Sequence, residues 1–244
     1  MYQFFVEENQ LSKDRISILG NDVNHIKNVL RMKTGERVRV SISDNGRSFF
    51  GSIASITEDE VIVDIEKEDE AGTELSNRIY LFQGLPKGDK MELIIQKAVE
   101  LGVYQVVPVA MKNCVVKLDE KKASSKVKRW QAIAESAAKQ SKRTLIPEIK
   151  MPMSWKMALE EARKLDVVLV PYENERGMEA TREAIQNIKP NQSVAIFVGP
   201  EGGFSPEEIE NIPANERISL GRRILRTETA GLATLSMLIF CLDE

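Results

Sequence analysis

The first part of the chain contains short runs of alternating or β-branched apolar residues. Such runs predict strands, because successive side chains of a strand point to opposite faces of a sheet. Residues 22–31 instead place Val23, Ile26, Val29 and Leu30 at helical spacing, which predicts one helix. Short and closely spaced strands are typical of a small β-barrel. The predicted strands are residues 2–6, 15–19, 36–43, 47–56 and 61–66.

From residue 78 onward, strand-length apolar runs alternate with segments of helical periodicity. This alternation predicts an α/β domain, in which helices cover both faces of a parallel sheet. The predicted strands are residues 78–83, 105–109, 166–170, 193–198 and 217–220. The predicted helices are residues 89–101, 126–139, 155–165, 177–188, 206–212 and 227–242.

A charged segment without apolar periodicity separates the two patterns. Residues 67–77 read KEDEAGTELSN and contain Gly72, which is typical of a linker. The sequence therefore predicts a β-barrel domain over residues 1–70, a linker over residues 71–77 and an α/β domain over residues 78–244.

Two predicted strand-to-helix loops have the same construction. One reads GPEGGFSPEE from Gly199 and the other reads LGRRILRTETA from Leu220. Both follow the carboxyl ends of predicted parallel strands, so we expect them to lie side by side and to form a ligand pocket. Either loop taken alone would equally fit an ordinary capped turn.

The first of these loops favours a neutral or cationic ligand. Gly199, Gly202 and Gly203 remove Cβ atoms where a ligand approaches the backbone, and Pro200 stiffens the turn. A phosphate-binding loop carries lysine and bare amides, whereas Glu201 and two further glutamates lie here beside a predicted helix N-terminus. An anion would therefore be repelled.

The second loop combines apolar walls with a polar end. Leu220, Ile224 and Leu225 surround Gly221 and suit an adenine ring, and the polar segment 226–229 follows. An adenine joined to a cation indicates S-adenosylmethionine.

These motifs resemble those of the SPOUT methyltransferases, and they are closest to the family that methylates N3 of a uridine in small-subunit ribosomal RNA. The resemblance covers nearly the whole chain, because further motifs occur in the same order. These are His25 with residues 29–32 and Gly35, residues 87–92 with 100–102, and residues 137–141 with Arg143.

The resemblance implies a fold, a cofactor and partners. The barrel is expected to be a PUA-like RNA-binding domain, and the α/β domain is expected to contain a trefoil knot, which is rare among folds. The resemblance also implies S-adenosylmethionine as cofactor, ribosomal RNA of the small ribosomal subunit as substrate, and a homodimer to which the last helix contributes. The alternatives are a SPOUT methyltransferase acting on another RNA nucleotide and a noncatalytic RNA-binding assembly factor of the same fold.

The chemistry of uridine N3 assigns candidate catalytic residues. Loss of the N3 proton leaves a negative charge shared with O2 and O4, which a cation can stabilise. Arg226 is the candidate for that task, and Glu201 or Glu228 is the candidate proton acceptor. Glu201 could instead hold the amides of its own loop, and Thr227 could cap the last helix. The expected cofactor-binding residues are Val170, Pro171, Gly199, Pro200, Glu201, Gly202, Leu220, Gly221, Ile224, Leu225, Arg226 and Thr227.

Charge is unevenly distributed along the chain. The net charge of −3 does not by itself indicate a nucleic-acid binder, but lysine and arginine outnumber acids strongly over residues 112–143. With the family motifs present, this segment favours RNA phosphates over a merely solvated helix face. Gln3 and Asn113 stand where the family usually carries arginine, which puts an RNA contact there in doubt. The expected RNA-binding residues are His25, Arg31, Lys112, Lys121, Lys122, Lys139 and Arg143.

Cysteine and histidine usage narrows the chemistry further. Cys114 and Cys241 lie far apart without histidine partners, which excludes a zinc cluster, so no metal is expected. A Ser-His-Asp or Cys-His catalytic set is excluded unless the single His25 serves, which its setting does not favour. No charged-then-apolar leader begins the sequence, and the longest apolar run, residues 230–242, is shorter than the roughly 20 residues that span a bilayer. A cytoplasmic protein without a membrane partner is expected.

Overall fold

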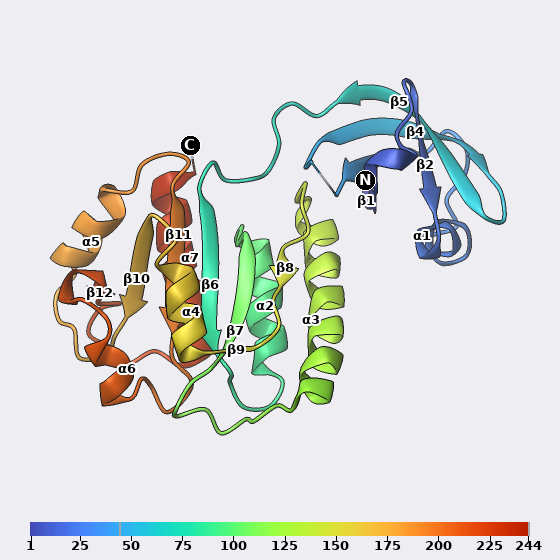
Figure 1. Ribbon diagram of the computed structural model, residues 1–244. Coiled ribbons are helices and arrows are strands. Elements are labelled where there is room, and N and C mark those ends of the chain that lie inside the picture. Colours follow the sequence, from blue (N-terminus) through green and yellow to red (C-terminus); the bar gives the residue numbers. More distant parts are fainter. Residues whose placement is uncertain (44, 244) are drawn as a thin grey trace. The chain divides into compact units, whose positions relative to one another are not determined.

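The computed structural model describes residues 1–43 and 45–243, which form two compact units (Figure 1). The first unit contains Met1–Glu74 together with Ala138–Ile146. The second contains Leu75–Ala137 together with Pro147–Glu244. The predicted division at residues 71–77 places Ala138–Ile146 with the α/β domain, so the return of this segment to the first unit is a feature that the sequence pattern does not signal.

The first unit is a curled sheet around an apolar core. Strand β1 runs parallel to β3, and the other neighbouring strands are antiparallel. Inward-facing side chains such as Phe4, Ile16 and Val38 are almost completely buried. Register shifts between β4 and β5 bend the sheet, as bulges do. In neighbour order the strands are β1 (Tyr2–Val6), β3 (Arg37–Ile42), β4 (Ser48–Ile56), β5 (Glu60–Glu68) and β2 (Arg15–Leu19), and a short 3₁₀ turn, η1 (Glu8–Gln10), follows β1.

The helix predicted over residues 22–31 is shorter and wider than a regular α-helix. One α-helical turn, α1 (Asn21–Asn24), continues into the π-helical turn η2 (His25–Val29). The Leu30 amide donates to the carbonyl of His25, and Arg31 then adopts a positive φ of 53°. The wider turn rotates the side chains, so Val29 is 64% exposed although its spacing predicted burial.

A buried polar network holds Ala138–Ile146 within the first unit. Gln3, Arg39 and Arg143 are 4%, 5% and 3% exposed. The Gln3 side chain donates to the backbone carbonyl of Arg143, and Arg39 contacts the Asp69 carboxylate at 2.6 Å. These contacts are polar, which explains why apolar periodicity gives no sign of them.

The second unit is an α/β domain with a parallel sheet, which confirms the predicted fold class. In neighbour order its strands are β12 (Arg217–Ile218), β10 (Val167–Pro171), β11 (Ser193–Val198), β6 (Arg78–Gly84), β7 (Gln105–Ala110) and β8 (Glu148–Ile149), with β9 (Met153–Ser154) also paired to β7. All of these described pairs are parallel. The helical elements are α2 (Lys90–Glu100), α3 (Glu120–Ser141), α4 (Trp155–Ala162), α5 (Glu179–Gln186), α6 (Pro206–Glu210), the 3₁₀ turn η3 (Ala214–Glu216) and α7 (Thr227–Leu242). The residues of α3 from Ala138 onward belong to the first unit.

Helices α4 and α7 cover opposite faces of this sheet. Trp155 of α4 packs edge-on against Phe197 of β11, with ring centroids 5.1 Å apart. Gly231 of α7 lies instead beside Val198 and Leu81. Successive residues of a strand face opposite sides, so Phe197 and Val198 assign the two helices to different faces. The loops between the strands and these helices all leave the carboxyl edge of the sheet.

Candidate cofactor pocket

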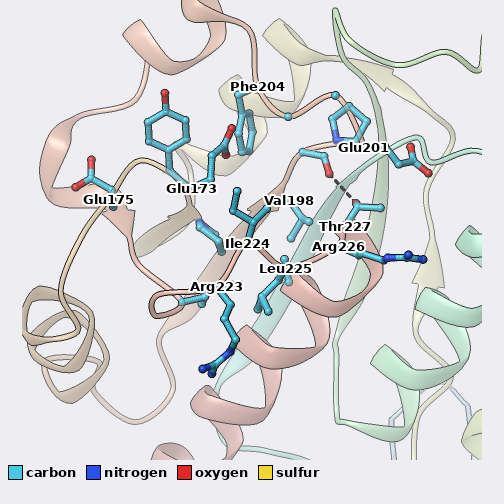
Figure 2. A pocket seen from close by; sticks show the side chains of 18 of the residues that line it. Glu173, Glu175, Val198, Glu201, Phe204, Arg223, Ile224, Leu225, Arg226 and Thr227 are labelled. Carbon is cyan, nitrogen blue, oxygen red and sulfur yellow. Dashed lines mark hydrogen bonds between the residues drawn. The ribbon is translucent and has the colours of Figure 1, made fainter.

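A cavity of about 580 Å³ lies at the carboxyl edge of the parallel sheet. It is formed by the loops that follow β10, β11 and β12, together with the first turn of α7 (Figure 2). Lys90, the first residue of α2, also lines it. Val170 is buried in β10 and does not line the cavity, whereas the other candidate cofactor residues do. They are Pro171, Gly199, Pro200, Glu201, Gly202, Leu220, Gly221, Ile224, Leu225, Arg226 and Thr227. Their contact with a cofactor stays a prediction.

Sequence reasoning missed a third loop of the cavity. The segment after β10 contributes Tyr172, Glu173 and Glu175, but it contains no glycine-turned motif that would have singled it out. Its position after a parallel strand was the signal that could have found it. The other lining residues not predicted are Lys90, Val198, Gly203, Phe204, Ser219, Arg223 and Ala230.

Thr227 ties the two glycine loops together. Its hydroxyl donates to the carbonyl oxygen of Gly199 at 2.7 Å and accepts a hydrogen bond from the buried Gln83 side chain at 2.9 Å. Thr227 is the first helical residue of α7, and Arg226 occupies the N-cap position. Thr227 therefore joins the two loops and does not cap the helix. Figure 2 shows the bond from Thr227 as the link between the upper and lower loops.

The first glycine loop packs tightly on Asn113. The Asn113 amide nitrogen donates to the carbonyl oxygens of Gly202 and Gly203 at 3.0 and 3.2 Å. A Cβ atom added at Gly202 would lie 3.0 Å from the Asn113 Cβ, and Gly203 has a positive φ of 66°. Asn113 thus holds the loop in place.

The helix that follows this loop begins with a capping box. The Ser205 hydroxyl accepts from the Glu208 amide, and the Glu208 carboxylate accepts from the Ser205 amide at 2.7 Å. Glu208 also accepts from the backbone amide of Lys112 at 2.9 Å. These carboxylate contacts occupy the donors that a phosphate would use, which agrees with the preference for a neutral or cationic ligand.

One end of the cavity carries a cluster of charges. The Lys90 ammonium lies 2.9 Å from the Glu201 carboxylate and 3.3 Å from the Glu228 carboxylate. The Lys87 amide also donates to Glu201, at 3.1 Å. Arg226 is exposed at the same end of the cavity, opposite Glu175 in Figure 2, and no ion pair of Arg226 occurs among the described residues.

The contacts of Glu201 suit a structural carboxylate better than a base. Burial acts to raise the pKa of Glu201, but hydrogen bonds from Lys90 and from backbone amides outweigh it and lower that pKa below its ordinary value. The hydrogen bond to Glu201 is in turn the largest factor that raises the pKa of Lys90. A carboxylate of lowered pKa binds a proton less readily, which argues against Glu201 as the proton acceptor.

The candidate RNA-binding residues differ in how they are engaged. His25 and Arg31 are exposed in the first unit, and Lys121 is exposed in the second. Two exposed lysines form ion pairs, since Lys112 contacts Glu207 at 2.7 Å and Lys122 contacts Asp119 at 3.2 Å. The RNA contacts predicted for these residues stay predictions.

Lys139 and Arg143 hold the first unit together instead of facing solvent freely. Lys139 pairs with Asp22 at 3.1 Å, and the buried Arg143 pairs with Glu74. An RNA contact by either residue would first require that pair to break. Gln3 is buried within the same unit, so the position where the family usually carries arginine is here part of the packing.

Two absences hold for residues 1–43 and 45–243. No helix in this part of the chain is long and apolar enough to cross a membrane. The same residues contain no group of three or more histidine, cysteine, aspartate or glutamate side chains that could hold a metal ion.

Comparison with known proteins places both parts of the chain. The RNA methyltransferase domain family matches residues 73–239, and the RNA methyltransferase PUA domain family matches residues 18–66. Ribosomal RNA small subunit methyltransferase E of Bacillus subtilis (strain 168) is 36% identical over 251 residues, which cover 98% of this chain and 96% of the relative. The enzyme of the same name from Mesomycoplasma hyopneumoniae (strain 232) is 35% identical over 243 residues, covering 98% and 99%.

A solved structure agrees with these relatives. The crystal structure of a ribosomal RNA small subunit methyltransferase E from Neisseria gonorrhoeae bound to S-adenosyl methionine has a TM-score of 0.85 and 29% sequence identity. The match covers 98% of this chain and 97% of that chain.

The class of the protein is thus an RNA methyltransferase domain of SPOUT fold joined to a PUA domain. The chain belongs to the ribosomal RNA small subunit methyltransferase E family. The resemblance inferred from the sequence motifs and the PUA-like nature of the N-terminal domain are confirmed. The trefoil knot and the homodimer that the resemblance implies stay predictions.

Proposed function

We propose that the protein transfers a methyl group from S-adenosylmethionine to N3 of a uridine in ribosomal RNA of the small subunit. The observation that carries the proposal is the cavity between two glycine loops, in a chain of this family. Its volume of about 580 Å³ lies within the range of small-molecule sites. Purified protein should therefore methylate small-subunit ribosomal RNA, and mass spectrometry of that RNA from a deletion strain should show one missing methyluridine.

The residues of the cavity fit the proposed cofactor. Val198, Leu220, Ile224 and Leu225 offer apolar walls for the adenine, and glycine backbone groups lie between them. The acidic residues around the cavity suit a positively charged sulfonium better than a phosphate. The chemistry that S-adenosylmethionine supplies is an electrophilic methyl group, whose carbon bonds to N3 while sulfur keeps the electron pair of the broken bond.

The charged end of the cavity has the groups that deprotonation of uridine requires. We assign stabilisation of the uridine anion to Arg226, which has no competing ion pair among the described residues. Glu228 is the preferred proton acceptor over Glu201, because two donors already hold Glu201. Uridine N3 is hidden in base pairs, so the target nucleotide should be unpaired or extruded when it reaches the cavity.

Gly202→Val is expected to abolish binding of S-adenosylmethionine. The valine Cβ would lie 3.0 Å from the Asn113 Cβ, so the glycine loop that lines the cavity would have to shift. Isothermal titration calorimetry measures the affinity, while thermal unfolding shows whether the variant is folded. An unchanged affinity in a folded variant would contradict the assignment of this loop to the cofactor site. If the unaltered protein does not bind S-adenosylmethionine, the noncatalytic alternative is favoured.

RNA affinity is expected to fall steeply with salt. We assign phosphate contacts to the cations around His25 and Arg31 in the first unit and to the start of α3 in the second. Each neutralised phosphate contributes a slope of roughly −0.7 to −0.9 in a plot of log affinity against log salt. Charge reversal at Lys121, Lys122, Lys126 and Lys128 should weaken binding and flatten that slope.

A control reverses the charge of three lysines elsewhere on the second unit. Reversal at the exposed Lys156, Lys164 and Lys189 should leave the affinity and its salt slope nearly unaltered. Filter binding or fluorescence anisotropy with a small-subunit RNA fragment gives both quantities. Equal losses in the two sets of variants would mean that net charge, not a local surface, governs binding.

Assembly and location complete the proposal. We assign a homodimer, because α7 leaves Phe240 of its last turn 88% exposed in the monomer. Analytical ultracentrifugation tests this assignment, and a monomer at micromolar concentration would contradict it. The proposed site of action is the cytoplasm, where fractionation of cells should find the protein with its ribosomal RNA substrate.

A further inference from the structure

Lys90 is a cavity residue whose ammonium group is held by two separate elements. Glu201 reaches it from the loop after β11, at 2.9 Å, and Glu228 reaches it from the first turn of α7, at 3.3 Å. Lys90 itself begins α2 and lines the cavity. An ammonium group has three N–H donors, so two carboxylates leave one donor over.

The same contacts keep Lys90 charged. Its hydrogen bonds to Glu201 and Glu228 outweigh desolvation and raise the pKa of the ammonium above its ordinary value. A lysine of raised pKa does not accept a proton near neutral pH, so Lys90 is not a general base. It is a positioned cation that can donate to an anion.

Lys90 and Arg226 bring two cations to one end of the cavity. Both line it, and Arg226 lies two residues before Glu228, which contacts Lys90. Glu201 and Glu228 are the carboxylates that contact Lys90, and the formal charges of these three groups and Arg226 sum to zero. A further negative charge that develops here meets two cations.

The uridine anion has two places where such donors can act. Its N3 lies between C2 and C4, and the negative charge spreads to the oxygen atom on each of these carbons. Donors at both oxygens stabilise the anion and leave the N3 lone pair free to attack a methyl carbon. O2 and O4 lie on opposite sides of N3. A single cation can therefore donate to one of these oxygens but not well to both.

We propose that Lys90 is a second catalytic cation, which donates its remaining N–H to one uracil carbonyl oxygen while Arg226 serves the other. This inference rests on the proposed uridine-N3 function. The N3 proton passes to Glu228 or water, N3 bonds to the methyl carbon, and sulfur keeps the electrons of the broken bond. The anion and the sulfonium both become neutral, and Lys90 stays protonated throughout.

The first test replaces Lys90 by methionine in the full chain. Turnover at saturating cofactor and RNA should fall by roughly 10²-fold, as when an oxyanion donor is lost. Affinity for S-adenosylmethionine, measured by calorimetry, should change little. The matched control is Lys97→Met on the same helix, which removes an ion pair with Glu100 at 2.8 Å and should keep normal turnover. Normal turnover in Lys90→Met would overturn the proposal.

The second test separates contact with the substrate from mere positioning of the carboxylates. RNA carrying 2-thiouridine or 4-thiouridine at the target weakens one hydrogen-bond acceptor at a time. In the unaltered protein, each thio substitution should change turnover. In Lys90→Met, one of the two substitutions should no longer do so, and in Arg226→Lys the other should no longer do so. Unaltered effects of both substitutions in Lys90→Met would show that Lys90 only positions its neighbours, which overturns the proposal.

A charge-conserving variant guards against loss of folding. Lys90→Arg keeps a cation between Glu201 and Glu228, so it should fold even if the methionine variant does not. In this variant too, the same thio substitution should no longer change turnover as it does in the unaltered protein. Failure of the proposed function gives a different result, because the unaltered protein would then not methylate uridine N3 at all. In that event the inference about Lys90 falls with it.

Discussion

Arg226→Lys is expected to lower the turnover number by roughly 10²-fold or more, with affinity for S-adenosylmethionine nearly intact. The substitution keeps the charge but loses the planar fork of donors, and Arg226 sits at the N-cap of α7 on the edge of the cavity. Steady-state kinetics on small-subunit ribosomal RNA measures the effect. Raising the pH toward the ionisation of N3 should partly rescue the variant, because the enzyme then has less charge to stabilise.

A role for Arg226 in binding an RNA phosphate gives the opposite pattern. The Michaelis constant for RNA would then rise, turnover at saturation would stay close to normal, and pH would bring no rescue. Arg223 provides a comparison, since it also lines the cavity but is not assigned to the anion. That pattern would discard the catalytic assignment of Arg226 and leave the methyltransferase proposal standing.

Glu74→Ala is expected to destabilise the first unit by about 1–3 kcal/mol, because it removes the carboxylate that accepts hydrogen bonds from a buried guanidinium and from two backbone amides. The Arg143 side chain is 4% exposed, and Glu74 also accepts hydrogen bonds from the amides of Thr144 and Leu145. Hydrogen exchange of β3 amides measures the opening of this unit. Their exchange should become about 10- to 10²-fold faster.

A surface ion pair of the same unit supplies the control. Glu68 pairs with Arg47 on the exposed side of the sheet, at 2.7 Å, so Glu68→Ala should change the exchange of β3 far less. Glu74→Gln should lie between the two, because it keeps hydrogen-bond acceptors but removes the charge. Similar exchange in Glu74→Ala and Glu68→Ala would show that the buried network contributes little to stability.

The order and type of most elements could be predicted because their apolar periodicity is strong. The predicted bounds of the strands at residues 2–6, 15–19 and 193–198 match β1, β2 and β11, and the last helix matches α7. The prediction failed where backbone geometry, not periodicity, decides. The π turn at His25–Val29 exposes a valine that regular helical spacing would bury.

The candidate cavity was predictable to the extent that its loops carry glycine. Pairing of the loops after β11 and β12 followed from the rule that ligands bind at the carboxyl edge of parallel strands. Long-range polar contacts left no comparable signal. Neither the bond from Thr227 to Gly199 nor the ion pair of Lys90 with Glu228 can be read from spacing, because each joins elements that are distant in the sequence.

The strand order of the parallel sheet has a consequence for synthesis on the ribosome. One side of β6 pairs with β7, which follows it closely along the chain. The other side pairs with β11, which is synthesised much later, and there Ile79 lies opposite Val194. Until β11 has emerged, β6 is an edge strand of an incomplete sheet and can pair with other chains. The cavity loops after β11 and β12 emerge later still, so a chain stopped early would be prone to aggregation and could not bind cofactor. A growing chain would therefore bind cofactor only near the end of its translation.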